Sequence, residues 1–414
     1  MTAMAATLRG DRLPTYALFG AILSGAGLPI YIYAPKFFAD TYGVSLATLG
    51  AVLFALRLFD VVQDPALGWV SERLRAARGA AIPFGAALLA VSMIGLFAIA
   101  PPIDPIWWFA LTLTGLFTAF SFLTINFYAQ GVQKAGEIAG GHVRLAAWRE
   151  SGALLGVCLA AIAPTALMGI TAAPFATFAI GFAAVVALAT IAMAPEWRPA
   201  HTAEPTPIGA ILRDPTARRL LILALVNATP LAVSSTLFLF FVESRLQAPG
   251  WEGPLLVLFF LAAAASAPGW AWLSARIGAK RTLLSAMVLA IVSFAFVLTL
   301  GPGDTTAFAI ICIASGATIG ADLTLMPALF ARRMAAISPN AGQGFGLWSL
   351  VTKFTLAFAA AALLPLLEVS GFRSGVTDNP AFALQVLTYL YALVPCLLKL
   401  VAIALLVATP LEED

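Results

Sequence analysis

The sequence predicts an all-α, polytopic membrane protein with twelve transmembrane helices in two pseudo-symmetric six-helix bundles. Three observations lead to this fold class: the composition, the run of apolar segments, and the placement of basic residues. The chain has 414 residues, of which 61% are hydrophobic and 10% are charged, and its mean hydropathy is +0.96. A soluble protein cannot bury that much apolar surface, whereas a bilayer accepts it along every helix.

The apolar segments have the length that a membrane requires. A hydrocarbon core of about 30 Å needs roughly 20 apolar residues in a helix, so each long apolar segment predicts one span. Twelve such segments follow one another along the chain: 14–38, 46–71, 81–101, 105–130, 143–167, 172–194, 217–242, 253–275, 282–301, 305–331, 343–368 and 381–408.

A polar stretch divides these segments into two groups of six. The sixth and seventh segments are separated by EWRPAHTAEPTPIGAILRDPTARR, whose prolines and mixed charges suit a linker. We therefore expect an N-terminal bundle over residues 1–194, a cytoplasmic linker over 195–216 and a C-terminal bundle over 217–414.

The basic residues predict the orientation. With a cytoplasmic N-terminus, 17 of the 23 Lys and Arg residues fall on the inner side, three fall outside and three lie within spans. Cytoplasmic loops carry an excess of Lys and Arg, so both termini should be cytoplasmic and the protein should be a multi-pass protein of the inner membrane.

The two halves also resemble each other locally. GWVSERLRAARG (68–79) follows the second segment, and GWAWLSARIGAKR (269–281) follows the eighth, at the same place in each half. Internal repeats of spans are typical of transporters that rock two halves around a central site. The alternative is that both are positive-inside loops that share two residues by chance.

Three charges interrupt the second apolar segment. Arg57, Asp60 and Asp64 lie at positions that share one face of a helix, and such a polar stripe cannot face lipid cheaply. Counted from residue 46, Asp60 lies about 21 Å along the helix, near the middle of the membrane. Two carboxylates one turn apart favour a cation or a proton between them, and Gln63 can add an amide oxygen. A structural ion pair of Arg57 explains only one of the two carboxylates.

Two further charges fall within later spans. Lys353 lies in the middle of the eleventh, where an unpaired ammonium is costly, so we expect it to pair with Asp60 or Asp64 from the facing half. Asp322, in the tenth span, either pairs with a neighbouring Arg or lines the cavity. Arg57, Lys353 and Asp322 form the predicted charge network.

These motifs resemble those of the major facilitator superfamily. Within it, the series Arg57, Asp60, Asp64, Pro65, Gly68 resembles the melibiose-carrier branch, the glycoside–pentoside–hexuronide:cation symporters. The segments TINFYAQ (124–130) and GQGFGLWSLVTKF (342–354), the latter with Lys353, are similar to that branch too.

The resemblance implies roles for several residues. Positions matching Asp60, Gln63, Asp64 and Ser121 surround the coupling cation in that family. Gln63 stands where the best-known members carry Asn, and its longer side chain shifts the amide oxygen, so the expectation leans from Na⁺ to H⁺. Carboxylates that bind sugar hydroxyls in the family are replaced here by Ser24 and Thr124. The candidate substrate-binding residues are Ser24, Tyr31, Thr124, Tyr128, Arg149, Trp348 and Lys353, although an interfacial aromatic belt also explains Tyr31.

The sequence thus predicts a secondary active transporter that couples H⁺ or Na⁺ to symport of a small organic solute, sugar-like or an organic anion. A lysolipid-type transporter of the same fold is the main alternative. An intramembrane prenyltransferase with an Asp motif would need a second acidic motif, which the later spans lack, so we expect no enzyme activity. We expect no cofactor beyond the coupling ion, no metal beyond Na⁺ at Asp60 and Asp64, no nucleic-acid partner, and a monomer in the lipid bilayer.

Overall fold

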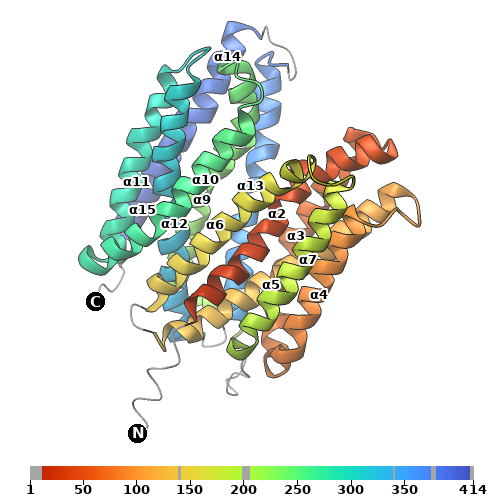
Figure 1. The fold of residues 1–414 in the computed structure, drawn as a ribbon. Helices are drawn as coiled ribbons and strands as arrows, with labels where there is room; N and C mark the ends of the chain where they lie inside the picture. The colour runs from red at the N-terminus through yellow and green to blue at the C-terminus, as the bar shows by residue number, and fades with distance from the viewer. Residues whose placement is uncertain (1–11, 139–140, 198–205, 339–340, 374–378, 411–414) are drawn as a thin grey trace.

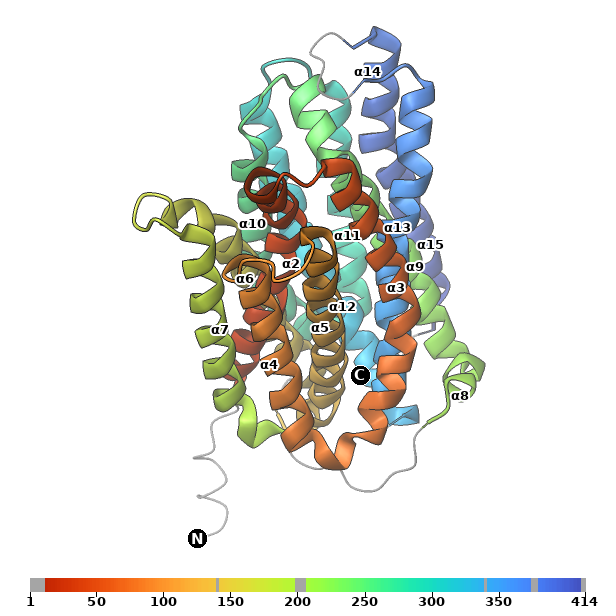
Figure 2. The same ribbon diagram turned by 90° about the vertical axis from the view of Figure 1, so that its right-hand side faces the viewer.

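The computed structural model describes residues 12–138, 141–197, 206–338, 341–373 and 379–410. Within these ranges the chain forms helices and no strand, and the long helices run side by side as an elongated bundle (Figure 1 and Figure 2). Ten helices of the described residues are long and apolar enough to cross a membrane, and Leu13–Gly27 is a shorter apolar helix. The expected all-α membrane fold is therefore confirmed.

The first six expected spans are single helices joined by short connections. They are α2 (Leu13–Tyr42), α3 (Leu46–Arg73), α4 (Arg78–Phe97), α5 (Pro105–Ala135), α6 (Gly141–Leu167) and α7 (Pro174–Met193). Their starting points follow local chemistry. Ser45 caps α3 by accepting a hydrogen bond from the Thr48 amide at 3.1 Å, and the Asp104 carboxylate accepts one from the Ile106 amide at 2.9 Å, just before Pro105.

The remaining spans include two π-helical turns. The helices are α9 (Pro215–Phe240), α10 (Glu252–Ile277), α11 (Ala279–Ala295), α12 (Thr305–Ile337), α13 (Gly342–Val369), α14 (Ala381–Thr388) and α15 (Val394–Ala408). π-Helical turns extend α9 over Phe241–Arg245 and join α14 to α15 over Tyr389–Leu393, so the twelfth expected span is built from three pieces. The polar linker pattern did not predict a helix, yet the described part of that stretch contains the short α8 (Ile208–Arg213).

The start of α2 and the end of α15 lie at the same end of the bundle, which is called the inner end here (Figure 1). At this end each half of the chain contains an arginine that stacks on a tryptophan of its own helix. The guanidinium of Arg73 lies 3.9 Å from the ring centroid of Trp69, and that of Arg276 lies 3.9 Å from the ring centroid of Trp272. In each pair the Arg follows the Trp by four residues on the same helix, and the two pairs lie in the segments whose similarity suggested a repeat.

The halves make their most extensive contacts through two pairs of helices, α3 with α13 and α6 with α10. On the α3–α13 side the backbones approach closely at the inner end. A Cβ atom on Gly68 would lie 2.9 Å from the carbonyl oxygen of Gly342, and one on Gly346 would lie 2.9 Å from the carbonyl oxygen of Asp64. Small residues spaced four apart allow such contacts between membrane helices. The division into bundles at residues 194 and 217 stays a prediction.

Candidate functional site

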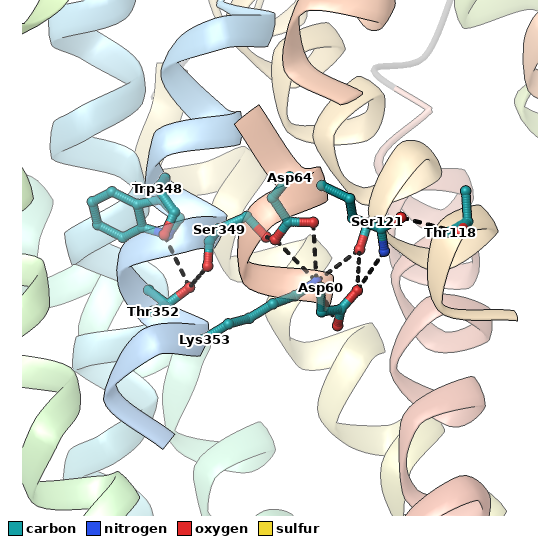
Figure 3. Close-up of polar contacts among 9 residues, drawn as sticks. Asp60, Asp64, Thr118, Ser121, Trp348, Ser349, Thr352 and Lys353 are labelled. Atoms are coloured by element: carbon teal, nitrogen blue, oxygen red, sulfur yellow. Dashed lines mark hydrogen bonds and ion pairs between the residues drawn. The ribbon is translucent and has the colours of Figure 1, made fainter. Parts of the chain in front are cut away.

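The centre of the site is the ammonium group of Lys353, which α13 extends toward two carboxylates on α3 (Figure 3). Its Nζ lies 3.0 Å from Asp60 Oδ2 and 3.0 Å from Asp64 Oδ2. Asp60 is 2% exposed and Asp64 is fully buried. The two carboxylates lie one helical turn apart on α3, so a single cation can reach both. One ion pair thus connects the first half of the chain to the second.

The helix α5 supplies the third partner. Lys353 Nζ donates to Ser121 Oγ at 2.7 Å, so its three N–H groups are directed to Asp60, Asp64 and Ser121. The buried ammonium therefore has a complete set of partners, which offsets the cost of removing it from water.

Two further hydroxyl groups, those of Ser349 and Thr118, take part in the hydrogen bonds around the carboxylates. Ser349, one turn before Lys353 on α13, donates to Asp64 Oδ2 at 2.6 Å. Thr118, on α5, donates to the amide oxygen of Gln63 at 3.1 Å, while the amide nitrogen of Gln63 donates to Asp60 Oδ1 at 2.7 Å. Gln63 thus presents its NH₂ group to Asp60, and its oxygen accepts from Thr118; its role as a cation ligand stays a prediction.

Four aromatic and charged side chains pack together on the inner side of the Lys353 cluster. The Arg149 guanidinium is 3.6 Å from the ring centroid of Tyr128, and its Nε donates to Glu150 Oε1 at 2.8 Å. Tyr128 donates its hydroxyl to the same oxygen at 2.8 Å, and its ring packs 5.2 Å from that of Phe345. Arg149 and Glu150 are both buried. The structure therefore neutralises the Arg149 charge with the adjacent carboxylate.

The other predicted substrate residues occupy different surroundings. Trp348, on α13 next to Ser349, is 9% exposed and packs against Phe330 with ring centroids 4.9 Å apart. Ser24 on α2 is half-buried. Thr124 lies one turn from Ser121 on α5, and its Oγ1 is buried without a hydrogen-bond partner among the described residues. The side chains of Tyr31 and Arg57 lie outside the described residues.

Asp322 does not belong to the Lys353 network, which corrects the prediction. Its carboxylate pairs with Lys399 from α15, and Lys399 also donates to Asn227 Oδ1 of α9 at 2.7 Å. This second cluster lies within the second half of the chain, beside a cavity of about 80 Å³ that the three residues help to line. The predicted Arg partner of Asp322 is therefore replaced by Lys399, which had no assigned role.

Polar contacts also seal the α3–α13 side at the inner end. The carboxylate of Glu72 on α3 accepts hydrogen bonds from the backbone amide of Gln343 at 2.8 Å and from its side-chain amide at 3.2 Å. Ser71 donates to Asn126 of α5 at 2.8 Å. All four side chains are buried. The Glu72 contacts join the start of α13 to the end of α3, directly beyond the glycine contact, and the Ser71 contact joins α3 to α5.

Sequence reasoning missed several of these residues, although some carried a signal. Ser349 lies four residues before Lys353, so helical spacing alone places both on the face that meets Asp60 and Asp64. Glu72 and Gln343 are polar residues at the ends of two spans that the predicted carboxylate–lysine pairing already brings together. The sequence offered no such signal for Asn227 and Lys399, because nothing in their own segments indicates which helix each residue contacts.

Comparison with known proteins agrees with this architecture. A family model described as "MFS/sugar transport protein" matches residues 15–413. Among solved structures, an outward-facing bacterial homologue of the iron transporter ferroportin superposes with a TM-score of 0.73 at 14% identity, covering 96% of this chain and 98% of that one. The human organic anion transporter MFSD10 (TETRAN) superposes with a TM-score of 0.66 at 16% identity, covering 95% and 99%.

No curated protein sequence matches the chain. The structural relatives are too distant in sequence to show more than the shared fold. The family model, by contrast, spans nearly the whole chain. The chain is therefore a membrane transporter of the major facilitator superfamily and belongs to its family of MFS/sugar transport proteins.

Proposed function

We propose that the protein is a cation-coupled symporter of the melibiose-carrier type, which moves a small, sugar-like solute by alternating access. The observation that carries this proposal is the bridge from Lys353 on α13 to Asp60 and Asp64 on α3. A charge pair that spans the two moving halves can be altered by a coupling ion, whereas a pair inside one half would move as a unit.

The proposed coupling step is a competition for the carboxylates. In the described arrangement the ammonium of Lys353 satisfies both Asp60 and Asp64. A proton or Na⁺ that binds one carboxylate leaves Lys353 with a single anionic partner, which weakens the connection between α3 and α13. The halves can then rearrange with the cation aboard, and loss of the cation on the other side restores the bridge.

H⁺ is the coupling ion that the site geometry favours. Na⁺ needs several oxygen ligands at about 2.4 Å, whereas a proton needs only one carboxylate oxygen. The Gln63 amide oxygen accepts from Thr118, and the Gln63 amide nitrogen is directed toward Asp60. Among the described residues, the carboxylates of Asp60 and Asp64 and the hydroxyls of Ser121 and Ser349 then offer oxygens beside Lys353, without the amide oxygen that Na⁺ would gain from residue 63.

The charge distribution favours a neutral, hydroxyl-bearing solute over an organic anion. Arg149 is paired with Glu150, and Lys353 is shared by two carboxylates, so neither basic group is left to bind an anion. The hydroxyl of Thr124, which has no hydrogen-bond partner among the described residues, can exchange a hydrogen bond with a sugar hydroxyl, and Trp348 and Tyr128 supply apolar ring surface. This is why, between the two predicted solute classes, we favour the sugar-like one.

Proteoliposomes test the proposal directly. Purified protein should be supplied with neutral sugars, organic anions and lysolipids in turn, under an imposed pH gradient and under an imposed Na⁺ gradient. We expect a neutral sugar to be concentrated with the pH gradient, and its addition to alkalinise the external medium. Na⁺-dependent uptake without proton movement would transfer the coupling to Na⁺, and gradient-independent uptake of every solute would refute symport.

The proposed orientation, with both termini cytoplasmic, can be checked by labelling single cysteines in the 206–212 segment from each side.

A further inference from the structure

A series of ring contacts crosses from the first half to the second on the inner side of the Lys353 cluster. Tyr128 of α5 lies 5.2 Å from Phe345 of α13, measured between ring centroids. Phe330 of α12 lies 5.5 Å from Phe345 and 4.9 Å from Trp348 by the same measure. The contact of Tyr128 with Phe345 therefore joins the two halves through aromatic side chains.

This contact lies further in than the proposed solute site. Along α13, a rise of about 1.5 Å per residue places Phe345 about 12 Å inward of Lys353. Along α5, the same rise places Tyr128 about 10 Å inward of Ser121, which contacts Lys353. Thr124, a residue of the proposed solute site, lies one turn outward of Tyr128 on the same helix. A solute beside Thr124 thus meets the ring contact on its way to the inner end.

Other contacts close the bundle at the same level. Gly346 directly follows Phe345, and a Cβ atom on it would lie 2.9 Å from the carbonyl oxygen of Asp64, so α13 and α3 touch through their backbones. Buried apolar residues of α5 pack in one cluster with those of α12 and α13: Ile125, Ala129, Val132, Phe330, Met334 and Phe345. Both halves therefore contribute to one packed apolar layer, and an apolar constriction is a barrier to water and polar solutes.

Tyr128 is fixed to the first half by its hydroxyl and by its ring. The hydroxyl donates to Glu150 Oε1 at 2.8 Å, and Arg149 Nε donates to the same oxygen at 2.8 Å. The Arg149 guanidinium also lies 3.6 Å from the centroid of the Tyr128 ring, within the range of a cation–π interaction. These contacts all come from α5 and α6, so they set the position and the tilt of the ring that Phe345 meets.

We propose that Tyr128 and Phe345 form the inner gate of the solute path, and that Arg149 and Glu150 are positioning residues that hold Tyr128 in the gate. The structure has this gate closed. When the halves separate at the inner end, Tyr128 stays with α6 while Phe345 leaves with α13, which opens the path beside Thr124. The proposal rests on the alternating access of the proposed function, but not on the coupling ion or the solute.

Cysteine labelling from the inner side measures gate opening without any transport. Thr124→Cys is introduced in a chain whose three native cysteines are replaced by alanine, and inside-out vesicles receive a small charged thiol reagent. We expect slow labelling when the gate is unchanged and about tenfold faster labelling with Phe345→Ala. Ala76→Cys, at an exposed position of the inner end, gives the rate for a fully accessible thiol. Labelling of Thr124→Cys at that rate with the gate unchanged would overturn the proposal.

A matched phenylalanine separates the gate from general loosening of the bundle. Phe308 is 1% exposed and Phe345 is 2% exposed, but the Phe308 ring packs against rings of the second half alone among the described residues. Phe308→Ala should leave the labelling rate within about twofold of the starting protein. An equal increase from both substitutions would refute the gate. Phe345→Leu, which removes the ring and retains much of the volume, should give a smaller increase and serves where the alanine variant does not fold.

Tyr128→Phe tests the positioning role, because it removes only the hydroxyl that Glu150 accepts. We expect about threefold faster labelling of Thr124→Cys. Tyr16→Phe is the control, since Tyr16 is a buried tyrosine of the first half whose hydroxyl donates to Glu196 at 3.5 Å. Equal rates for the two variants would overturn the positioning role. A protein that shows the expected labelling pattern but concentrates no solute under either gradient would retain the gate and lose the proposed symport.

Discussion

The protein contains two buried lysine–carboxylate clusters that differ in one respect. Lys353 joins α13 to Asp60 and Asp64 of α3, across the two halves, whereas Lys399 joins α15 to Asp322 of α12, within the second half. Each lysine also has a neutral polar partner: Ser121 in the first cluster and Asn227 in the second. The chemistry is nearly the same, but only the first cluster must change when the halves move.

The comparison shows that a buried charge pair cannot be assigned a role from its chemistry alone. A pair within one rigid bundle is a cost that folding has to offset, and it remains constant through a transport cycle. A pair between bundles is part of the conformational equilibrium, because its energy differs between the two arrangements. Four predictions separate these roles, beginning with the largest expected effect.

Neutralising the carboxylates should separate the clusters most clearly. Asp60→Asn and Asp64→Asn should each abolish cation-driven accumulation while leaving some solute exchange, because the coupling cation loses its anionic partner. Asp322→Asn should leave concentrative uptake per folded molecule within about threefold of wild type, since a twofold to threefold change corresponds to well under 1 kcal/mol. Uptake into proteoliposomes, normalised to folded protein, measures both. Normal accumulation by either α3 variant would contradict the assignment.

The loss of stability, unlike the loss of uptake, should be largest when the second cluster is changed. Asp322→Asn leaves the Lys399 ammonium buried without a counter-charge, which costs about 3–5 kcal/mol in buried pairs of this kind. The double change Asp322→Leu with Lys399→Met removes both charges and should recover most of that loss. Chemical or thermal unfolding in detergent provides the measurement. A double variant as unstable as Asp322→Asn would show that the two residues do not act as a pair.

Ser349 offers a smaller change at the first cluster. Its hydroxyl hydrogen bond to Asp64 favours the charged carboxylate, so Ser349→Ala should make binding of the coupling cation easier and raise its apparent affinity about tenfold. Thr352→Ala is the matched control, because the Thr352 hydroxyl donates only to the backbone of α13, at Trp348 and Ser349. The dependence of uptake on cation concentration gives the affinity, and equal effects of the two substitutions would argue against a specific role of Ser349.

The smallest effect is expected at an ion pair nearer the surface. Asp214, just before α9, accepts from the Ala217 amide at 2.7 Å and pairs with Arg333, and these hydrogen bonds hold the pKa of its carboxyl below the ordinary value. The lowered pKa gives stability that is complete above about pH 4 and is lost as pH falls through the folded-state value. Asp214→Asn should therefore cost about 1 kcal/mol at pH 7. The difference from wild type should shrink in unfolding measurements below pH 4, and a constant difference would exclude this ion pair as its cause.

The sequence predicted the spans and the first cluster because both depend on local geometry and on the cost of charge in a membrane. Asp60 and Asp64 share a helix face by spacing, and Lys353 needed a partner at the same depth. The second cluster could not be predicted, because the meeting of Lys399 with Asp322 depends on how α12 and α15 pack. The direction of the Gln63 amide depends likewise on Thr118, a residue 55 positions away on another helix.

The three groups at the first cluster also determine how the membrane voltage acts on the proposed cycle. Asp60, Asp64 and Lys353 carry a net charge of −1 when both carboxylates are ionised, and one bound cation brings them to neutrality. Reorientation of the loaded cluster therefore moves no net charge, whereas the empty cluster returns as an anion. A potential that is negative inside drives that return outward, with about 2.3 kcal/mol per charge for each 100 mV across the full membrane. Voltage should accordingly raise the maximal rate of uptake and leave the half-saturating solute concentration comparatively unchanged.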